Sequence, residues 1–267
     1  MGVLNVTPDS FSDGGLYATA ESAVARGLDM IDAGADLIDV GGESSRPGAE
    51  PVPVGVELER VIPVIEALAA AVGRTGPAVR LSVDTVKPEV ARAALAAGAS
   101  LVNDISASLW EVAGAAGAGW VAMHMRGQPR TMQESPRYGA VAEEVRSFLL
   151  ERAGLALQGG VREVWVDPGI GFGKTKAHNL SLLRHLDDLV EAAAGAGCAG
   201  VVVGTSRKNF LGLLAAHRGS GKPAPVADRM EGSLATAAAA LVAGVGMVRV
   251  HDVAATVQMT RLYGPAA

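Results

Sequence analysis

The stretch AGADLIDVGG, residues 33–42, predicts the fold because it joins a helix end to a buried strand. An Ala-Gly pair is typical of a helix C-terminus, where glycine adopts the left-handed conformation. The apolar run that follows is short and ends in a polar residue, Asp39, as in a strand covered on both faces of a parallel sheet. The stretch therefore predicts one repeat of a helix-then-strand architecture.

The same pattern recurs along the chain. Four more segments repeat it in full: AGASLVNDIS (97–106), AGAGWVAMHM (116–125), GAGCAGVVVGTSRK (195–208) and AGVGMVRVHD (243–252). Three segments have the strand without the full lead-in: GVLNVT (2–7), VRLSVDT (79–85) and EVWVDPG (163–169). Helical patterns lie between them, at Thr19–Ala33, Gly55–Ala71, Pro88–Ala97, Ala140–Leu157, Asn179–Ala193 and Gly232–Ala243.

Eight short strands that alternate with helices in 267 residues predict a single α/β domain, residues 1–267, folded as a (β/α)8 TIM barrel. A doubly wound open sheet is the alternative, and the weak internal repeat favours the barrel. The composition supports a large core, because hydrophobic residues make up 49% of the chain and charged residues 19%. The 34 glycines show no collagen period, so we expect them at specific turns and close contacts.

Charge and cysteine usage argue against several kinds of partner. The net charge is −5 with no lysine-rich stripe, which disfavours nucleic acid as a ligand. Cys198 is the only cysteine, so no intrachain disulfide can form, as is usual in a reducing compartment. The sequence has neither an apolar run of about 18 residues nor a signal-peptide pattern, so we expect no membrane partner and a cytoplasmic protein.

Each predicted strand ends in a residue that can form a hydrogen bond or titrate. These residues are Asn5, Asp39, Asp84, Asn103–Asp104, His124, Asp167, Ser206 and His251. Active sites of TIM barrels lie at the carboxyl ends of the strands, so the sequence predicts a site at this rim. The loops at 7–15 and 41–55 are rich in Gly, Pro and Ser and are candidate lids on the same face, whereas 217–228 reads as a plain surface connection.

Asp84, Asn103 and Asp167 offer two carboxylates and an amide at the ends of the third, fourth and sixth strands, where they can meet at the barrel mouth. This set suits a nitrogen heterocycle with amino, amide and ring N–H groups. The alternative is that these side chains only cap the loops that follow. Phe172 could cover a flat ligand and Lys174 could add a cation to it.

Ser206, Arg207 and Lys208 come just before a predicted helix, whose free N–H groups and dipole favour an anion. Arg249 and His251 lie two residues apart in an extended segment and point to the same side. Together with Asn5 they predict a diphosphate site. A solvated helix start is the alternative for Arg207 and Lys208.

Other functions for these polar residues are weaker. His124 could be a metal ligand, a base or a buried structural histidine, and His178 and His185 are expected at the surface. No GxSxG motif surrounds Ser206, so a serine nucleophile paired with His251 is disfavoured. The carboxylates are too dispersed for a protein metal cage; a single Mg²⁺ bound through diphosphate and one protein amide is the simpler arrangement.

Eight blocks in this order resemble the dihydropteroate synthases, a family of pterin-binding TIM barrels. They are MGVLNVTPDSFSDGG (1–15), DVGGESSRPGA (39–49), SVDT (82–85), NDIS (103–106), MHMRG (123–127), DPGIGFGK (167–174), GTSRKNFLG (204–212) and RVHDV (249–253). The family joins 6-hydroxymethyl-7,8-dihydropterin diphosphate to 4-aminobenzoate, releasing diphosphate and 7,8-dihydropteroate in folate synthesis. The resemblance therefore implies these two small-molecule substrates, a Mg²⁺ cofactor and a homodimer.

The resemblance also implies a role for each matching residue. The pterin ring would be bound by Asp84, Asn103, Asp167 and Lys208, in a pocket lined by Met123 and Phe172. Asn5 would carry the Mg²⁺, and diphosphate oxygens would be held by Ser45, Arg249 and His251. Ser206 and the two lid loops would shape the aminobenzoate site, with Arg46 a further substrate-binding residue. Lys208, Arg249 and His251 would be the catalytic residues.

Three departures from the family pattern bear on these expectations. The chain starts directly at the first strand, and the Gly pair often found after NDIS is absent, which leaves the helix within 107–119 uncertain. Ser45 stands where many members have Thr, and its hydroxyl can serve equally. The DVGGESSRPGA loop carries no added residue, so sulfonamides are expected to compete with aminobenzoate.

Three alternatives share parts of these motifs. A methyltransferase that uses a folate methyl donor and a corrinoid protein would need a pterin pocket but neither the SRPG loop nor the anion site. A non-catalytic pterin-binding paralogue would not need Asn5, Arg46, Lys208, Arg249 and His251 together. A phosphate-binding barrel of another pathway is the third.

Overall fold

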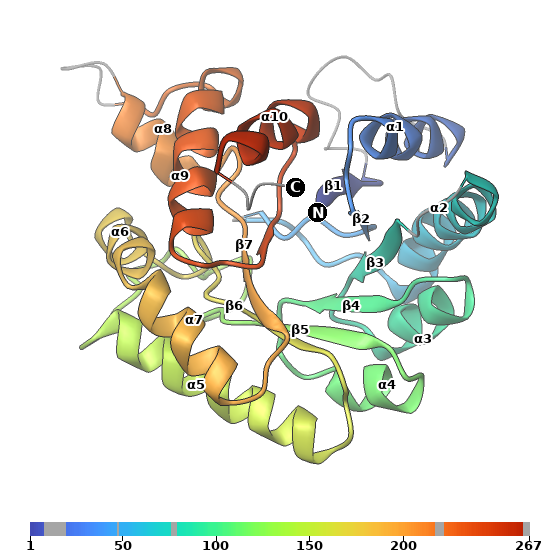
Figure 1. Cartoon of the computed structure of the whole chain (residues 1–267), viewed down its shortest axis with the longest axis horizontal. Coiled ribbons are helices and arrows are strands. Elements are labelled where there is room, and N and C mark those ends of the chain that lie inside the picture. The colour runs from blue at the N-terminus through green and yellow to red at the C-terminus, as the bar shows by residue number, and fades with distance from the viewer. Residues whose placement is uncertain (8–19, 47, 76–78, 217–221, 264–267) are drawn as a thin grey trace.

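A computed structural model describes residues 1–7, 20–46, 48–75, 79–216 and 222–263. Eight parallel strands form one sheet in the order in which they occur in the chain. The strands are β1 Gly2–Asn5, β2 Leu37–Gly41, β3 Arg80–Asp84, β4 Leu101–Asp104, β5 Gly119–Met123, β6 Val164–Asp167, β7 Gly200–Val203 and β8 Met247–Val248. The helices surround these strands on the outside (Figure 1).

The sheet closes on itself just beyond β8. Gly2 forms a parallel bridge with Val250, Val3 N donates to Val250 O at 2.9 Å, and Val250 N donates to Met1 O at 2.9 Å. An open doubly wound sheet would leave β1 and β8 at separate edges. The predicted TIM barrel is therefore confirmed.

The helices follow the predicted pattern with small shifts at their ends. They are α1 Ala20–Asp32, α2 Val54–Thr75, α3 Pro88–Ala96, α4 Trp110–Ala115, α5 Val141–Gln158, α6 Lys176–Arg184, α7 Leu186–Gly195, α8 Asn209–Ala215, α9 Met230–Val242 and α10 Val253–Tyr263. A helix within 107–119 is present as the short α4. The predicted lid at 7–15 lies outside the described residues except for Thr7, as do 217–221 of the surface connection; its described end holds the 3-10 turn η2, Val226–Asp228.

The single helix predicted at 179–193 is wrong, because two helices occupy this region. Thr175 caps α6 by accepting a hydrogen bond from His178 N at 3.2 Å, which starts the helix earlier than its apolar pattern indicates. The helix breaks at His185, and Asp187 and Asp188 lie in the first turn of α7. Acidic side chains favour a new helix N-terminus there.

Alternation along the strands separates two buried environments. Outward-facing side chains such as Ile38, Val83 and Val102 are fully buried against the helices. The inward-facing side chains include a separate apolar cluster at mid-barrel: Met1, Leu37, Leu101, Val121 and Val202. Two residues further along β2 and β4 the inward positions become polar, as at Asp39 and Asn103. The fold thereby places polar groups at the carboxyl rim above an apolar plug.

The opposite end of the barrel, its floor, is closed by an ion pair. Arg80 Nη1 and Nη2 donate to the two oxygens of Glu163 at 2.6 and 2.8 Å. Trp165 Nε1 adds a third hydrogen bond to Glu163 at 2.8 Å, and Arg80 Nε donates to Ser100 Oγ at 3.1 Å. In this network, the positively charged Arg80 donates to acceptors and the negatively charged Glu163 accepts from donors, so both charged groups have hydrogen-bond partners.

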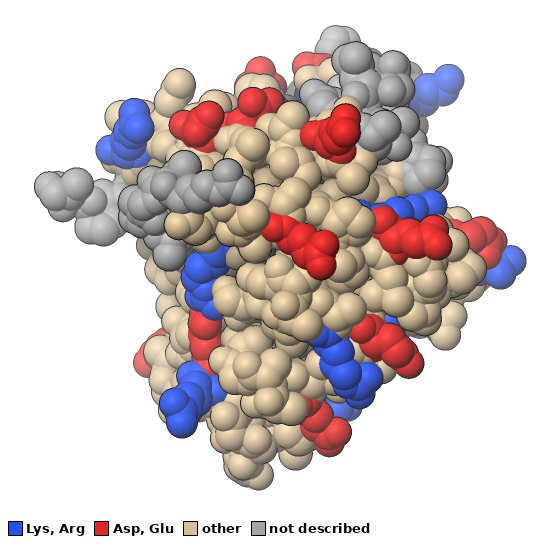
Figure 2. Space-filling view, turned by 90° about the vertical axis from the view of Figure 1, so that its right-hand side faces the viewer, with Lys and Arg blue, Asp and Glu red and all other residues tan. Residues whose placement is uncertain are grey.

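The surface adds little to the choice of partner. On the face in Figure 2, basic and acidic side chains lie in small interspersed groups. Among the described helices, none is both long enough and apolar enough to cross a membrane.

Candidate active site

The rim of the barrel brings together side chains from β2, β3 and β4 and from the segment after β8. Arg249 Nε donates to Asp39 Oδ2 at 2.6 Å, and Arg249 Nη2 donates to Asp84 Oδ2 at 2.7 Å. Asn103 Nδ2 also donates to Asp39 Oδ2, at 2.8 Å. We call Asp39, Asp84, Asn103 and Arg249 the rim cluster.

The rim cluster carries more carboxylate than its own cation can satisfy. Asp39 is fully buried, and its Oδ1 has no hydrogen-bond partner within the described part of the chain. Burial raises the pKa of Asp84 to about 7 even though Arg249 opposes the rise. Burial lowers the pKa of Arg249, but Asp39 and Asp84 outweigh it and raise the net value above the ordinary one, so the guanidinium stays charged. An unmatched buried acceptor of this kind is uncommon in proteins and suggests a binding function.

Asp167 and the loop after β6 form the next part of the rim. Asp167 Oδ1 accepts a hydrogen bond from Gly169 N at 2.7 Å, and burial raises the pKa of this carboxyl. Gly169 has φ +64°, and a Cβ at this position would overlap the carbonyl oxygen of His124. Only glycine therefore fits this turn.

Lys174 supports the loop after β6 and does not face a ligand, contrary to the sequence prediction. Its side chain is 2% exposed, and Nζ lies 2.9 Å from His124 Nδ1. Nζ also donates to the carbonyl oxygens of His124, Gly169 and Phe172 at 3.1, 3.0 and 3.0 Å. Burial lowers the pKa of Lys174 to about 7, and burial with the Lys174 charge lowers the pKa of His124 to about 3. His124 is thus a buried structural histidine, one of the three alternatives that the sequence left open.

Lys208 and Phe172 lie against each other beside the rim cluster. Lys208 Nζ is 4.7 Å from the centre of the Phe172 ring and donates a hydrogen bond to Ile170 O. A Cβ on Gly204 would lie 3.6 Å from Arg249 Cβ and 3.8 Å from Lys208 Nζ, so Lys208 and the start of the Arg249 side chain both pack near this glycine. Burial lowers the pKa of Lys208 to about 8. A half-buried aromatic ring and a cation thus stand next to the carboxylates.

Ser206 and His251 are in direct contact. His251 N and Nδ1 both lie 3.1 Å from Ser206 Oγ. Burial and the charge of Arg249 lower the pKa of His251 to about 3, so the imidazole is neutral. Asp252 does not complete a triad, because its carboxylate pairs with Arg207 at 3.0 and 2.5 Å. The geometry agrees with the prediction against a serine nucleophile.

The side chain of Arg207 is 37% exposed and pairs with Asp252, a contact that neither sequence-based interpretation, an anion ligand or a solvated helix start, included. Its backbone is left-handed, with φ +59°, and its N–H donates to Ser233 Oγ at 2.9 Å. Together with the Asp252 ion pair, this contact fixes the turn between Ser206 and Lys208. Arg207 therefore acts on the site indirectly, by holding the turn that carries Ser206 and Lys208.

Asn5, Met123, Ser45 and Arg46 complete the predicted set. A Cβ on Gly41 would lie 3.4 Å from Asp84 Cβ and 3.6 Å from Asn5 Oδ1, so Gly41 keeps space open between them. Met123 is 4% exposed and pairs in register with Asp167. Ser45 is half-buried and Arg46 exposed, and the Arg46 charge is near enough to contribute to the low pKa of His251.

The described residues hold no group of three or more His, Cys, Asp and Glu side chains that could bind a metal ion. A metal at this rim would therefore need oxygens from a ligand in addition to a protein amide such as Asn5. Asp39 is the rim residue to which the sequence gave no function. Its signal was a carboxylate inside the apolar run LIDVG, a position where burial without a partner is costly.

The site can bind a flat heterocycle rich in N–H groups at its carboxylates and an anion at its cations. The family model for pterin binding enzymes matches residues 1–251. The chain is 43% identical to the dihydropteroate synthase of Escherichia coli over 268 residues, which covers 98% of this chain and 89% of the relative.

Two solved structures are similar over almost the whole chain. Dihydropteroate synthase of Yersinia pestis, in complex with a sulfonamide drug, has a TM-score of 0.87 and 41% identity over 98% of this chain and 92% of that one. Dihydropteroate synthase of Xanthomonas albilineans, with 4-aminobenzoic acid, has a TM-score of 0.85 and 45% identity over 98% and 90% of the two chains.

Proposed function

Since the chain belongs to the pterin-binding enzymes and, among them, to the dihydropteroate synthases, we propose how its own residues carry out that transferase reaction. The reaction joins 6-hydroxymethyl-7,8-dihydropterin diphosphate to 4-aminobenzoate and releases 7,8-dihydropteroate and diphosphate. The rim cluster is the observation that supports the proposal most strongly, because it presents a buried acceptor without a partner in the described residues, Asp39 Oδ1, beside a fixed cation.

The pterin ring is bound by the acceptors of the rim. Its amino and ring N–H groups donate to Asp84 and Asp167, while the Asn103 amide matches a polar edge. Hydrogen bonds from these N–H groups to a carboxylate are stronger in a buried site, because water no longer competes for the carboxylate. Met123 and Phe172 cover the faces of the ring, and Lys208 supplies a charged donor next to Phe172.

The diphosphate is bound on the cationic side of the rim. Arg249 uses two N–H groups for Asp39 and Asp84, and a guanidinium has five, so three remain for phosphate oxygens. The neutral His251 ring and the Ser45 hydroxyl can each add one donor. Anchoring Arg249 to two carboxylates holds its charge in place before the substrate arrives.

The chemistry of Asn5 fits a Mg²⁺ held partly by the substrate. Its amide oxygen borders the open space over Gly41, and an amide with diphosphate oxygens is a donor set that Mg²⁺ accepts. When bound, Mg²⁺ neutralises charge on the diphosphate. Asn5 would hold the ion beside Asp84 without adding a second carboxylate to it.

The bond that breaks joins the exocyclic methylene carbon to the diphosphate oxygen, and its electron pair leaves with the diphosphate. Arg249 and His251 stabilise the charge that builds on this leaving group. The electron-rich dihydropterin supports a developing cation at the methylene, and the aminobenzoate amine then donates its lone pair and releases a proton. The arylamine is already a neutral nucleophile, so the mechanism requires no strong general base.

The aminobenzoate site is formed by Ser206 and the loop after β2, which carries Ser45 and Arg46. Sulfonamides resemble aminobenzoate in shape, and one occupies the similar Yersinia pestis enzyme. We therefore expect a sulfonamide to compete with aminobenzoate in this protein. Unchanged turnover under saturating sulfonamide would contradict this part of the proposal.

A direct assay measures diphosphate release from the pterin substrate, with and without 4-aminobenzoate and Mg²⁺. Dihydropteroate formation that needs all three supports the proposal. Pterin binding without product would point to a non-catalytic paralogue, and turnover that is insensitive to chelation would contradict the role of Asn5.

We also propose that two copies of the chain associate and that the enzyme acts in the cytoplasm. Leu213 and Leu214 on α8 and Met230 on α9 are 41, 49 and 41% exposed, which supports a face that a second copy could cover. Light scattering on the purified protein should give twice 27.1 kDa. Cell fractionation in the source organism tests the compartment.

A further inference from the structure

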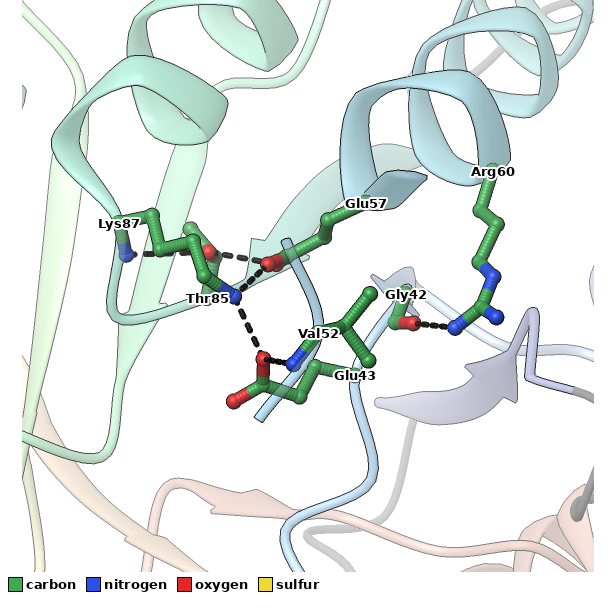
Figure 3. A network of polar contacts seen from close by, with 7 residues as sticks. All are labelled: Gly42, Glu43, Val52, Glu57, Arg60, Thr85 and Lys87. Atoms are coloured by element: carbon green, nitrogen blue, oxygen red, sulfur yellow. Dashed lines mark hydrogen bonds and ion pairs between the residues drawn. The ribbon is translucent and has the colours of Figure 1, made fainter. Parts of the chain in front are cut away.

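A second, partly buried charge cluster lies beside the rim and takes no part in the reaction described above. Lys87 Nζ donates to Glu43 Oε2 at 2.5 Å and also to Glu57 Oε2. Thr85 Oγ1 donates to the other Glu57 oxygen at 2.6 Å. Figure 3 shows the Lys87 ammonium between the two carboxylates, with Glu57 on α2, Glu43 on the loop after β2 and Lys87 just before α3.

Two further contacts connect this cluster to the loop at 42–53. Val52 N donates to Glu43 Oε2 at 2.8 Å, which ties the end of the loop to its beginning. Arg60 Nη1 donates to Gly42 O at 2.9 Å, which ties the first residue of the loop to α2. The loop between these ties includes Ser45, only two residues after Glu43.

The cluster also reaches the pterin side of the site. Thr85 follows Asp84 directly, and its N–H donates to Asn103 O at 3.2 Å. Lys87 N donates to Thr85 Oγ1 at 3.2 Å. The segment that presents Asp84 and the loop that carries Ser45 are therefore joined through one lysine.

The electrostatics of the cluster argue for a positional function. Glu57 is fully buried, and burying a carboxylate is costly even when it is paired, so an apolar side chain would often stabilise the fold as well. Partial burial lowers the pKa of Lys87, but Glu43 and Glu57 outweigh it and raise the value, so the ammonium stays charged. A charged lysine between two carboxylates specifies one arrangement of the loop, α2 and β3.

We propose that Glu43, Glu57 and Lys87 are positioning residues that fix the loop after β2 relative to Asp84, so that Arg46 and its part of the loop meet the second substrate once the pterin is bound. The cluster touches no reacting group and acts through the loop. This inference rests on the proposed function of that loop in binding aminobenzoate.

The sharpest test changes Glu43, because the Glu57–Lys87 pair then remains to preserve the fold. In Glu43→Ala we expect the KM for aminobenzoate to rise about tenfold, the size of effect that losing one charge-assisted contact produces. The dissociation constant of the pterin diphosphate, measured by calorimetry, should rise by no more than about threefold, because Ser45 is the one proposed ligand of this substrate on the loop, while Asp84, Asp167 and Arg249 stay in place. Hydrogen exchange at the Val52 amide should become faster. Glu43→Gln keeps an acceptor for Val52 N and should restore part of both effects.

Arg80→Met is the matched control, because it breaks another ion pair at the opposite end of the barrel. It should lower thermal stability while leaving the aminobenzoate KM and the Val52 exchange rate unchanged. Wild-type KM and wild-type Val52 exchange in Glu43→Ala would overturn the inference. If the wild-type protein forms no dihydropteroate, the proposed function fails, and Val52 exchange in Glu43→Ala still decides whether the cluster orders the loop.

Discussion

The two ends of the barrel each contain an arginine paired with carboxylate, but they differ in how completely the charges are matched. At the floor, Arg80 binds Glu163 through two N–H groups, and the hydrogen bond from Arg80 lowers the pKa of that carboxyl. At the rim, Arg249 divides its donors between Asp39 and Asp84, and one Asp39 oxygen has no partner in the described residues. The floor is satisfied by the protein alone, whereas the rim leaves a buried acceptor for the proposed ligand.

Lys174 shows that location alone does not decide this difference. It lies near the rim, yet its Nζ contacts the carbonyl oxygens of His124, Gly169 and Phe172 together with the His124 ring. Like the floor ion pair, Lys174 is satisfied by the protein alone, so we expect it to contribute to stability and not to ligand binding.

The largest effect is therefore expected for Lys174→Met. The substitution keeps the volume but removes the Lys174 donor from the carbonyl oxygens of His124 and Phe172 and from the His124 ring, while Gly169 O keeps the Phe172 N–H. The free energy of unfolding should therefore fall by about 3 kcal/mol. Urea denaturation followed by circular dichroism measures this loss. An unchanged midpoint would show that other donors replace Lys174 and that the loop after β6 does not depend on it.

Asp84→Asn tests the rim, where we expect a loss of ligand affinity and no loss of stability. The amide cannot accept two N–H groups as the carboxylate does, so the affinity for pterin diphosphate should fall by about 2 kcal/mol, or about thirtyfold. The free energy of unfolding should not fall, because burial raises the pKa of Asp84 and the ionised carboxylate therefore lowers the stability of the fold at neutral pH. Calorimetry measures the affinity and urea denaturation the stability; wild-type affinity would remove Asp84 from the binding site.

The sequence predicted the features that depend on neighbouring residues and missed those that depend on pairing between distant residues. The apolar runs and Ala-Gly pairs predicted the strands and most helices, because strand and helix periodicity is a property of neighbouring residues. The polar strand ends predicted the rim for the same reason. The break at His185 was missed because the apolar pattern runs on through it, while Asp187 and Asp188 favour the start of a new helix there.

The sequence could not show which charges neutralise one another. Arg249 and Asp39 are 210 positions apart and meet only because the barrel closes. Arg207 was expected near an anion but pairs with Asp252, and Lys174 was expected to face a ligand but holds carbonyl oxygens. Each of these pairings depends on how close two elements lie in the folded protein, and nothing in the sequence around either residue indicates that distance.

The pH dependence of pterin binding should sharpen the contrast between the two ends. Asp84 has a pKa of about 7, so below this pH it is increasingly protonated and accepts fewer N–H groups. The affinity for the pterin diphosphate should therefore decrease as the pH falls from 8 to 6, by up to about tenfold per unit below the pKa. Calorimetry across this range tests the expectation, and Asp84→Asn should flatten the profile. A profile equally steep in both proteins would assign the titration to another group.

The smallest effect is expected at the floor. Arg80 and Glu163 are 36 and 30% exposed at their side chains, so solvent weakens their attraction, and Arg80→Met should lower the free energy of unfolding by only about 1 kcal/mol. Substrate affinity should not change, because the apolar plug of Leu37, Leu101 and Val121 separates the floor from the rim. Urea denaturation and calorimetry on the same sample measure both quantities. If Arg80→Met weakened pterin binding, the two ends would be coupled through the plug, and the division between a floor that stabilises and a rim that binds would be wrong.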